Sequence, residues 1–309
     1  MTLRILCVAL ALGAAVRGAR AQEMEPRAFS PSPMGTRFVA VAFGTSSGDV
    51  LLDPTVPITD VHANILQLGL GYGRSFGLAG RGGLWTAVVP LAYAHVDGMV
   101  AETARSVRRD GLADLRLRAS LNLLGGRAMN AAEFRTAPRT TIVGVALTVQ
   151  APSGEYDPVK LINLGTHRWA YKPEVGISVP IGAWTLEGFA GAWFFTSNDS
   201  FFPGQAIKRQ DPLTSLQGHV AYTFKPRTWL ALDGTWYGGG EVTIDEQPPG
   251  SRFSNSRLGA TLALPVSPRQ SLKLAGSRGA QARLGSNFTT YAAAWQFVWL
   301  AKQAHAATP

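Results

Sequence analysis

The sequence predicts an all-β fold: a transmembrane antiparallel up-and-down β-barrel of about twelve strands, with long extracellular loops and short periplasmic turns. Three observations predict it: side chains that alternate with a period of two, connections that alternate in length, and an unusual composition. Only 16% of the 309 residues are charged while 46% are hydrophobic and 34 are glycine, whereas about a quarter of the residues of a soluble domain are charged. The apolar content excludes disorder, and no run after the N-terminus is long enough for a spanning helix.

The N-terminus has the pattern of a secretory signal peptide over residues 1–21. Arg4 precedes an apolar stretch from Ile5 to Val16, and Ala19-Arg20-Ala21 forms a cleavage site. The single cysteine, Cys7, lies within this peptide, so the exported chain has no disulfide, catalytic thiol or cysteine-ligated metal. The rest divides into a short N-terminal periplasmic segment at 22–35, a barrel at 36–300 and a C-terminal tail at 301–309.

The strands follow from the alternation. In 112–123, Leu115, Leu117 and Leu121 share one face while Arg116 and Arg118 share the other, which only a strand permits. Similar sorting occurs at 169–180, 214–224, 257–264 and 288–299, and the remaining segments are compatible with it. The predicted strands, in order, are 36–45, 64–74, 84–95, 112–123, 140–150, 169–180, 184–196, 214–224, 228–238, 257–264, 270–277 and 288–299.

The connections between these strands alternate in length. Those that we expect to be long lie at 46–63, 96–111, 151–168, 197–212 and 239–255, with a moderate one at 278–287. The short ones lie at 75–83, 181–183, 225–227 and 265–269, and 124–139 is longer than this pattern expects. Long loops at one end and short turns at the other are typical of barrels in the bacterial outer membrane, so we expect outer-membrane lipid as a partner.

Aromatic residues occupy the ends of the apolar faces. Trp85 and Tyr93 lie at opposite ends of one strand, as do Trp184 and Phe194, which predicts an aromatic girdle at each membrane interface. The last strand, 288–299, alternates aromatic residues like the terminal strand that the barrel-assembly machinery binds, although a tail follows it here.

Charged and polar side chains predicted to point inward define a candidate substrate pathway. Such charges must be paired or hydrated, so they form either a wet pathway or a salt-bridged filling. Arg116 and Arg118 lie two residues apart on one face and could together hold a carboxylate. The pathway candidates are Asp114, Arg116, Arg118, Lys172, Glu174, His219, Asp233 and Lys273, and the further inward candidates are Glu187, Arg257, Phe189, Trp193, Trp229 and Tyr237.

Enzymatic motifs are lacking in the sequence. It contains no G-x-S-x-G nucleophile elbow and no H-E-x-x-H metal motif. We therefore expect no enzyme, cofactor or metal site, and the dispersed basic residues do not suggest nucleic acid. A barrel enzyme such as a lipid hydrolase would require a Ser or Asp within hydrogen-bond reach of His219 or His95.

Several stretches resemble the family labelled "putative meta-pathway of phenol degradation". They are 25–35, Ala151-Pro-Ser-Gly-Glu-Tyr-Asp-Pro158 with Leu161-Ile-Asn-Leu-Gly-Thr-His-Arg-Trp169, Lys172-Pro-Glu-Val-Gly176, 256–265 and Ala294-Trp-Gln-Phe297. The resemblance implies an outer-membrane barrel that admits hydrophobic or aromatic compounds. Related barrels carry an N-terminal hatch, but 22–35 is too short for one, although Arg27 to Met34 could enter the periplasmic mouth.

The same resemblance makes the 156–169 loop a candidate gate. Alternatively it is an outer loop in which Asn163, Gly165 and Pro158 set turns. The candidate gating residues are Tyr156, Asp157, Asn163, His167 and Arg168.

The sequence thus predicts a channel that admits small hydrophobic or aromatic, and possibly anionic, organic compounds for catabolism. The alternative is a structural or adhesive barrel with a closed lumen.

Overall fold

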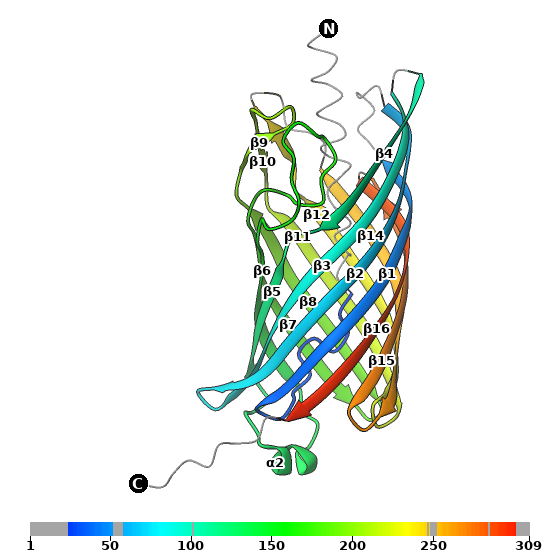
Figure 1. The fold of residues 1–309 in the computed structure, drawn as a ribbon. Helices are drawn as coiled ribbons and strands as arrows, with labels where there is room; N and C mark the ends of the chain where they lie inside the picture. Colours follow the sequence, from blue (N-terminus) through cyan, green and yellow to red (C-terminus); the bar gives the residue numbers. More distant parts are fainter. Residues whose placement is uncertain are drawn as a thin grey trace.

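The chain forms a closed antiparallel β-barrel in the computed structural model, which describes residues 24–51, 58–100, 102–245, 247, 252–283 and 285–300 (Figure 1). The predicted signal peptide and tail lie outside these residues. The barrel strands are β1 (Thr36–Leu51), β2 (Ile58–Leu78), β3 (Arg81–Val100), β4 (Thr103–Leu112), β5 (Arg116–Leu124), β6 (Ile142–Gln150), β7 (Ala170–Ile181), β8 (Trp184–Phe195), β11 (Leu213–Lys225), β12 (Thr228–Gly239), β14 (Phe253–Ser267), β15 (Gln270–Ala282) and β16 (Gly285–Leu300). Among the described residues, no helix is both long enough and apolar enough to cross a bilayer.

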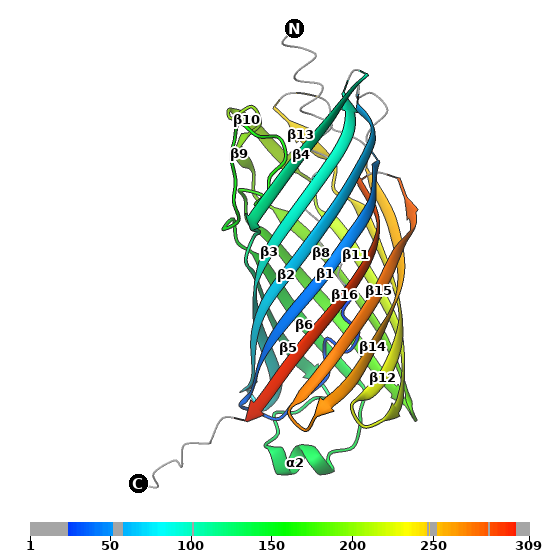
Figure 2. The ribbon, with the colours of Figure 1, turned by 45° about the vertical axis from the view of Figure 1, so that its right-hand side comes forward.

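The barrel has twelve strand positions, as predicted. The sheet contains thirteen strands, but β4 and β5 both pair with β3 and occupy one position in succession. Closure comes from β1 and β16, which pair antiparallel from Thr36 opposite Leu300 to Leu51 opposite Gly285. Figure 2 shows this seam, with the last strand lying beside the first.

Most strands are longer than predicted, so that β1 and β2, for example, occupy much of the predicted loop at 46–63. Two further differences concern the region around Asp114. The predicted strand at 112–123 is interrupted at residues 113–115, so Asp114 lies in the gap between β4 and β5. The predicted loop at 96–111 is instead a strand hairpin, because β3 and β4 pair from Leu91 with Leu112 to Val100 with Thr103. The sequence pattern did not predict this hairpin, because its residues are largely polar. Strands that extend beyond the membrane need no row of apolar side chains facing lipid.

The predicted 124–139 connection contains a short helix, α2 (Ala131–Thr136). The Asn130 side chain accepts hydrogen bonds from the backbone N–H groups of Ala132 and Glu133, and this cap fixes the start of the helix. Figure 1 places α2 at the end of the barrel where β1 begins and β16 finishes. Because the two-residue turns such as 182–183 and 226–227 also lie at this end, it is the periplasmic end.

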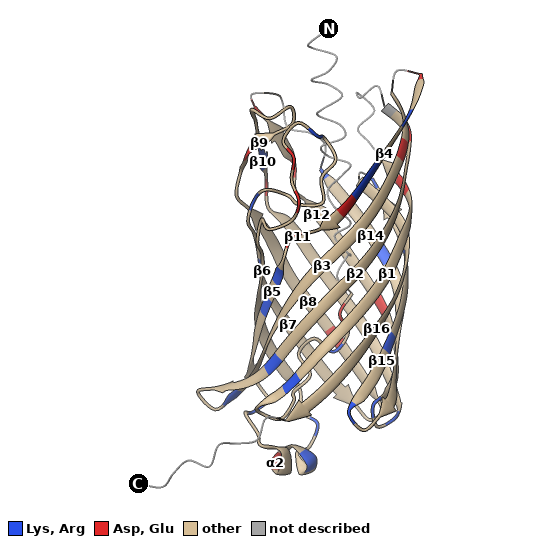
Figure 3. Ribbon diagram, in the orientation of Figure 1, with Lys and Arg blue, Asp and Glu red and all other residues tan. Residues whose placement is uncertain are grey.

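The period-two sorting of side chains is confirmed. In β7, Lys172, Glu174 and Ser178 are buried inside while Val175 and Ile177 are exposed outside. Charged positions are sparse along the middle of the barrel wall (Figure 3). The outer face therefore presents an apolar band to lipid.

Aromatic clusters mark the two edges of this band. Trp169 and Tyr171 stack with their ring centroids 6.3 Å apart toward the extracellular side. Trp184 and Tyr222 meet edge to face at 4.8 Å on the periplasmic side.

The described part of the N-terminal segment, residues 24–35, enters the barrel from its periplasmic end, as the sequence allowed for Arg27 to Met34. Phe29 is only 1% exposed and packs against Ile142, Ala146 and Phe189. Gly176 makes room for its ring, because a Cβ there would come within 2.3 Å of it. The segment therefore fills the periplasmic half of the lumen.

At the extracellular end, the loops are also folded. β9 (Asn198–Phe201), β10 (Ala206–Gln210) and β13 (Val242–Ile244) form a separate three-stranded sheet. Phe201, Ala206, Val242 and Ile244 are its buried core. This sheet gives the adjacent 151–169 loop a fixed surface to bind.

Candidate functional site in the barrel lumen

The lumen encloses a cavity of about 430 Å³. Glu25 and Ala28 of the N-terminal segment border it on the periplasmic side, and Ile162 to Thr166 of the 151–169 loop border it on the extracellular side. One wall is apolar and the opposite wall is polar. The apolar wall includes Ala42, Val50, Ala63, Ile65, Val88 and Phe288, and the polar wall includes Asp114, Arg116, Arg118, Gln150, Lys172, Glu174 and Gln217.

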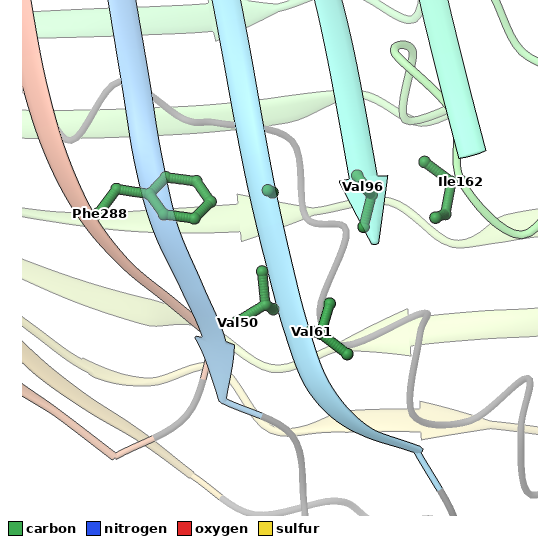
Figure 4. Close-up of a cluster of buried hydrophobic side chains, with 6 residues drawn as sticks. Val50, Val61, Val96, Ile162 and Phe288 are labelled. Atoms are coloured by element: carbon green, nitrogen blue, oxygen red, sulfur yellow. The ribbon is translucent and has the colours of Figure 1, made fainter. Parts of the chain in front are cut away.

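The 151–169 loop crosses the lumen to the apolar wall. Ile162 is 6% exposed and packs with Val50, Val61, Val96 and Phe288, which come from β1, β2, β3 and β16 (Figure 4). The neighbouring carbonyl of Ile162 accepts a hydrogen bond from Arg109 Nε at 2.8 Å. The loop that the sequence suggested as a gate therefore covers the extracellular side of the cavity.

The five candidate gating residues hold this loop in shape rather than lining the cavity together. Tyr156 stacks on His167 at 4.7 Å, and the Asn163 side chain bonds the backbone N–H and carbonyl of Asp157. Arg168 Nη2 donates to Gln210 Oε1 on β10. Of the five, only Asn163 lines the cavity.

Two loop groups have displaced pKa values. Burial raises the pKa of the Tyr156 phenol, which keeps its proton and donates to the Ser200 carbonyl at 3.0 Å. The hydrogen bond from Lys160 lowers the pKa of Asp157, and the two groups form an ion pair at 2.8 Å. Both groups tie the loop together rather than transfer protons.

Asp114 fastens the loop to the barrel wall. Its carboxylate accepts hydrogen bonds from Gln150 Nε2, Gly154 N, Thr166 N and Thr166 Oγ1, at 2.6 to 3.0 Å. The break between β4 and β5 places this side chain next to both ends of the loop. Asp114, predicted as a pathway charge, is thus primarily an anchor.

The inward charges on β5 and β7 form one cluster. Glu174 accepts Lys172 Nζ at 2.7 Å on one oxygen and Arg118 Nη2 at 3.2 Å on the other. The hypothesis that Arg116 and Arg118 jointly hold a substrate carboxylate stays a prediction. In the structure one Nη of Arg118 already binds a carboxylate of the barrel. Arg116 lines the cavity nearby.

His219 lies in a second buried cluster. Its Nδ1 and Asp233 Oδ1 are 2.7 Å apart, and the other Asp233 oxygen accepts from Thr261 Oγ1 at 2.7 Å. His219 Nε2 has no hydrogen-bond partner within the described residues. Lys273 Nζ lies 5.8 Å from the Trp229 ring centroid, accessible from the lumen.

The condition set for an enzyme, a Ser or Asp within hydrogen-bond reach of His219 or His95, is met. Asp233 and Asp97 lie within hydrogen-bond distance of His219 and His95, but no described hydroxyl bonds the second nitrogen of His219. The part of the chain that the structure describes contains no group of three or more His, Cys, Asp or Glu side chains able to hold a metal ion.

Sequence reasoning placed Glu187 and Phe189 on inward faces but did not predict that they hold the N-terminal segment. The Arg27 backbone N–H donates to Glu187 Oε2 at 2.6 Å, and Ser178 Oγ donates to Glu187 Oε1 at 2.9 Å. Met34 N donates to the Met129 carbonyl at 2.8 Å beside α2.

Comparisons with known proteins agree with this architecture. A family model described as "Putative MetA-pathway of phenol degradation" matches residues 43–297. The structure is similar to the COG4313 outer membrane channel from Pseudomonas putida F1, with a TM-score of 0.77 and 20% identity over 90% of this chain and 100% of that chain. It is also similar to the transport unit of the autotransporter AIDA-I from Escherichia coli, with a TM-score of 0.51 and 10% identity over 97% and 96% of the two chains. No curated protein matches the sequence.

The two structural likenesses support the fold, an outer-membrane β-barrel. The family match supports more, because it runs from β1 into β16 and so covers most of the chain. It also agrees with the resemblance carried by the 151–169 motif. The chain therefore belongs to the family described as "Putative MetA-pathway of phenol degradation".

Proposed function

We propose that this barrel is a channel that admits small apolar organic compounds, including aromatic ones, across the outer membrane for catabolism. The observation that carries the proposal is the cavity of about 430 Å³ with an apolar wall. Cavities of this size bury one small organic molecule. The apolar wall formed by Val50, Ile65, Val88 and Phe288 favours an apolar solute over water and ions.

Both ends of the cavity are closed by segments that are attached locally. The 151–169 loop is held by Asp114 and by the Ile162 contacts. The N-terminal segment is held by the Glu187 bond and the Phe29 contacts. Passage requires each segment to release its side of the cavity in turn, which favours a solute that is bound in between over free diffusion.

The test is uptake by liposomes containing the folded protein. Radiolabelled aromatic acids and sugars of similar size are compared for the wild type and for a variant lacking 157–166. We expect the wild type to favour the aromatic compounds, and the shortened loop to raise uptake of both classes. A deletion strain should also grow more slowly on aromatic carbon sources at limiting concentration. Absence of aromatic uptake by wild type and variant alike would refute the channel.

A structural barrel with a closed lumen is the second candidate. The ion pairs of Glu174 with Arg118 and Lys172, together with the inserted Phe29, favour it. Planar-bilayer conductance separates the two, because a structural barrel stays non-conducting even after 157–166 is removed.

A further inference from the structure

Arg257 on β14 is a buried cation with neutral partners. The residue is 4% exposed. Its Nη2 donates to Ser277 Oγ at 2.8 Å and Thr290 Oγ1 at 3.1 Å. No carboxylate of the described residues forms an ion pair with it, and its Nε has no hydrogen-bond partner.

This arginine ends a row of polar side chains with unused hydrogen-bonding atoms. Gln217, Thr235 and Arg257 are direct register partners on β11, β12 and β14. All three are less than 10% exposed, and Gln217 Oε1, Thr235 Oγ1 and Arg257 Nε each lack a partner. Buried polar atoms are normally paired, so three adjacent ones in a row indicate a surface built to bind something polar.

The row meets the cavity at its Gln217 end and comes within one side chain of it at Arg257. Gln217 lines the cavity directly. At the other end, the Arg257 guanidinium reaches Thr290, which lies on the inner face of β16 between Phe288 and Ala292, two residues that also line the cavity. A molecule in the cavity therefore has the apolar wall on one side, and Arg257 lies one side chain behind the cavity lining, next to Thr290.

The other buried cations facing the cavity differ from Arg257. Lys172 and Arg118 each form an ion pair with the Glu174 carboxylate. A buried guanidinium without an acid is costly, and its planar fork suits a carboxylate. The missing compensation at Arg257 is one negative charge.

We propose that Arg257 binds the carboxylate of an amphipathic monoanion whose apolar body occupies the cavity. This inference rests on the proposed channel function and names its substrate class. Thr235 and Gln217 border the same head-group site, and Ser277 and Thr290 hold the guanidinium in place.

The test is binding to folded protein in nanodiscs, measured by calorimetry against empty nanodiscs. The probes are 4-phenylbutyrate and its uncharged counterpart 4-phenylbutanol. The variants are Arg257→Met, Arg257→Lys and the control Arg278→Met. Arg278 is an exposed arginine on the neighbouring strand that pairs with the outward Leu258.

We expect the wild type to bind 4-phenylbutyrate more tightly than 4-phenylbutanol. Arg257→Met should weaken the binding of 4-phenylbutyrate by about 10- to 100-fold, as expected for losing charge-assisted hydrogen bonds. It should leave the affinity for 4-phenylbutanol unchanged. Arg257→Lys should lose less affinity for 4-phenylbutyrate than Arg257→Met does. Arg278→Met should bind both probes as tightly as the wild type.

The outcomes separate this inference from the proposed function. Equal binding of the acid by wild type and Arg257→Met refutes the carboxylate site while the apolar cavity stands. Binding of neither probe to the wild type refutes the channel and the carboxylate site together. If Arg257→Met does not fold, the wild type alone decides, because equal affinity for the acid and the alcohol would overturn the proposal.

Discussion

Inside the barrel, each buried carboxylate collects donors from several strands. Glu174 on β7 binds Lys172 on its own strand, Arg118 on β5 and Gln217 on β11. Asp233 on β12 binds His219 on β11 and Thr261 on β14. Such networks remain stable only while complete, because one missing partner leaves a buried charge behind.

Glu174→Gln should therefore destabilise the barrel strongly. Lys172 is 2% exposed and would lose its counterion, which costs about 3–5 kcal/mol. Urea unfolding in lipid vesicles, followed by tryptophan fluorescence, measures the loss. Glu102→Gln, at an exposed hairpin position, should change stability little, and equal losses for the two variants would contradict the network.

The alternation of polar and apolar residues predicted which face of the sheet these residues occupy. It did not predict which residues they bind. Facing depends on a period of two within one strand, whereas pairing depends on the register between strands. Arg118 illustrates the difference: its inward direction followed from Leu117 and Leu121 beside it. Its bond to Glu174, 56 residues away, appears only once β6 lies between the two strands.

Two elements without barrel strands border the cavity at its two ends. The 151–169 loop is fixed by one carboxylate and one apolar contact group, and the 24–35 segment by one carboxylate and one aromatic ring. How far each of these two segments reaches into the lumen could not be predicted from sequence, because it depends on contacts with distant strands. The sequence contains only the residues that make them, such as Ile162 and Phe29.

Asp114→Asn should loosen the loop while leaving the barrel folded. Oδ1 of Asp114 accepts from Gly154 N, and Oδ2 accepts from Thr166 N and Oγ1. An amide accepts with one oxygen only, so Asn keeps the bonds of one of these oxygens and loses those of the other. We expect faster protease cleavage within 151–169 and higher conductance. Asp110→Asn, on the outer face of β4, is the matched control, and unchanged cleavage in Asp114→Asn would refute the anchor.

Phe29→Ala should release the N-terminal segment. Burying an aromatic side chain contributes about 3–5 kcal/mol, more than one backbone bond to Glu187 can replace. Ion conductance in planar bilayers should rise by several-fold relative to the wild type. Phe43→Ala removes a ring from the exposed outer face and should conduct like the wild type; a silent Phe29→Ala would show that the segment does not occlude the path.

The whole molecule is organised around two faces of one curved sheet. Twelve positions, the facing of each strand and the short periplasmic turns followed from sequence, because lipid imposes a rule on every second residue. The hairpin of β3 and β4, the helix α2 and the inserted segment did not, because lipid does not constrain them. The membrane is thus the reason why so much of this fold could be predicted.

Substitution of outward residues should show this constraint directly. Leu232→Arg places a charge on the exposed face of β12 between the levels of Tyr222 and Trp236, at a cost of about 2–4 kcal/mol near the bilayer centre. Leu78→Arg, at the periplasmic end of β2, should cost about 0–1 kcal/mol. Unfolding in vesicles measures both, and equal costs would place Leu232 outside the lipid.

The pairing of β1 with β16 also determines when the barrel can close. Leu51 pairs with Gly285 and Thr36 with Leu300. The first strand of the barrel therefore pairs with its last strand, which is synthesised after all the other strands of the barrel. Until then both strands keep an open edge, which is prone to pairing with other chains, and contacts this distant in sequence form slowly. A chain that lacks residues 285–300 therefore has no partner for β1 and cannot close into this barrel.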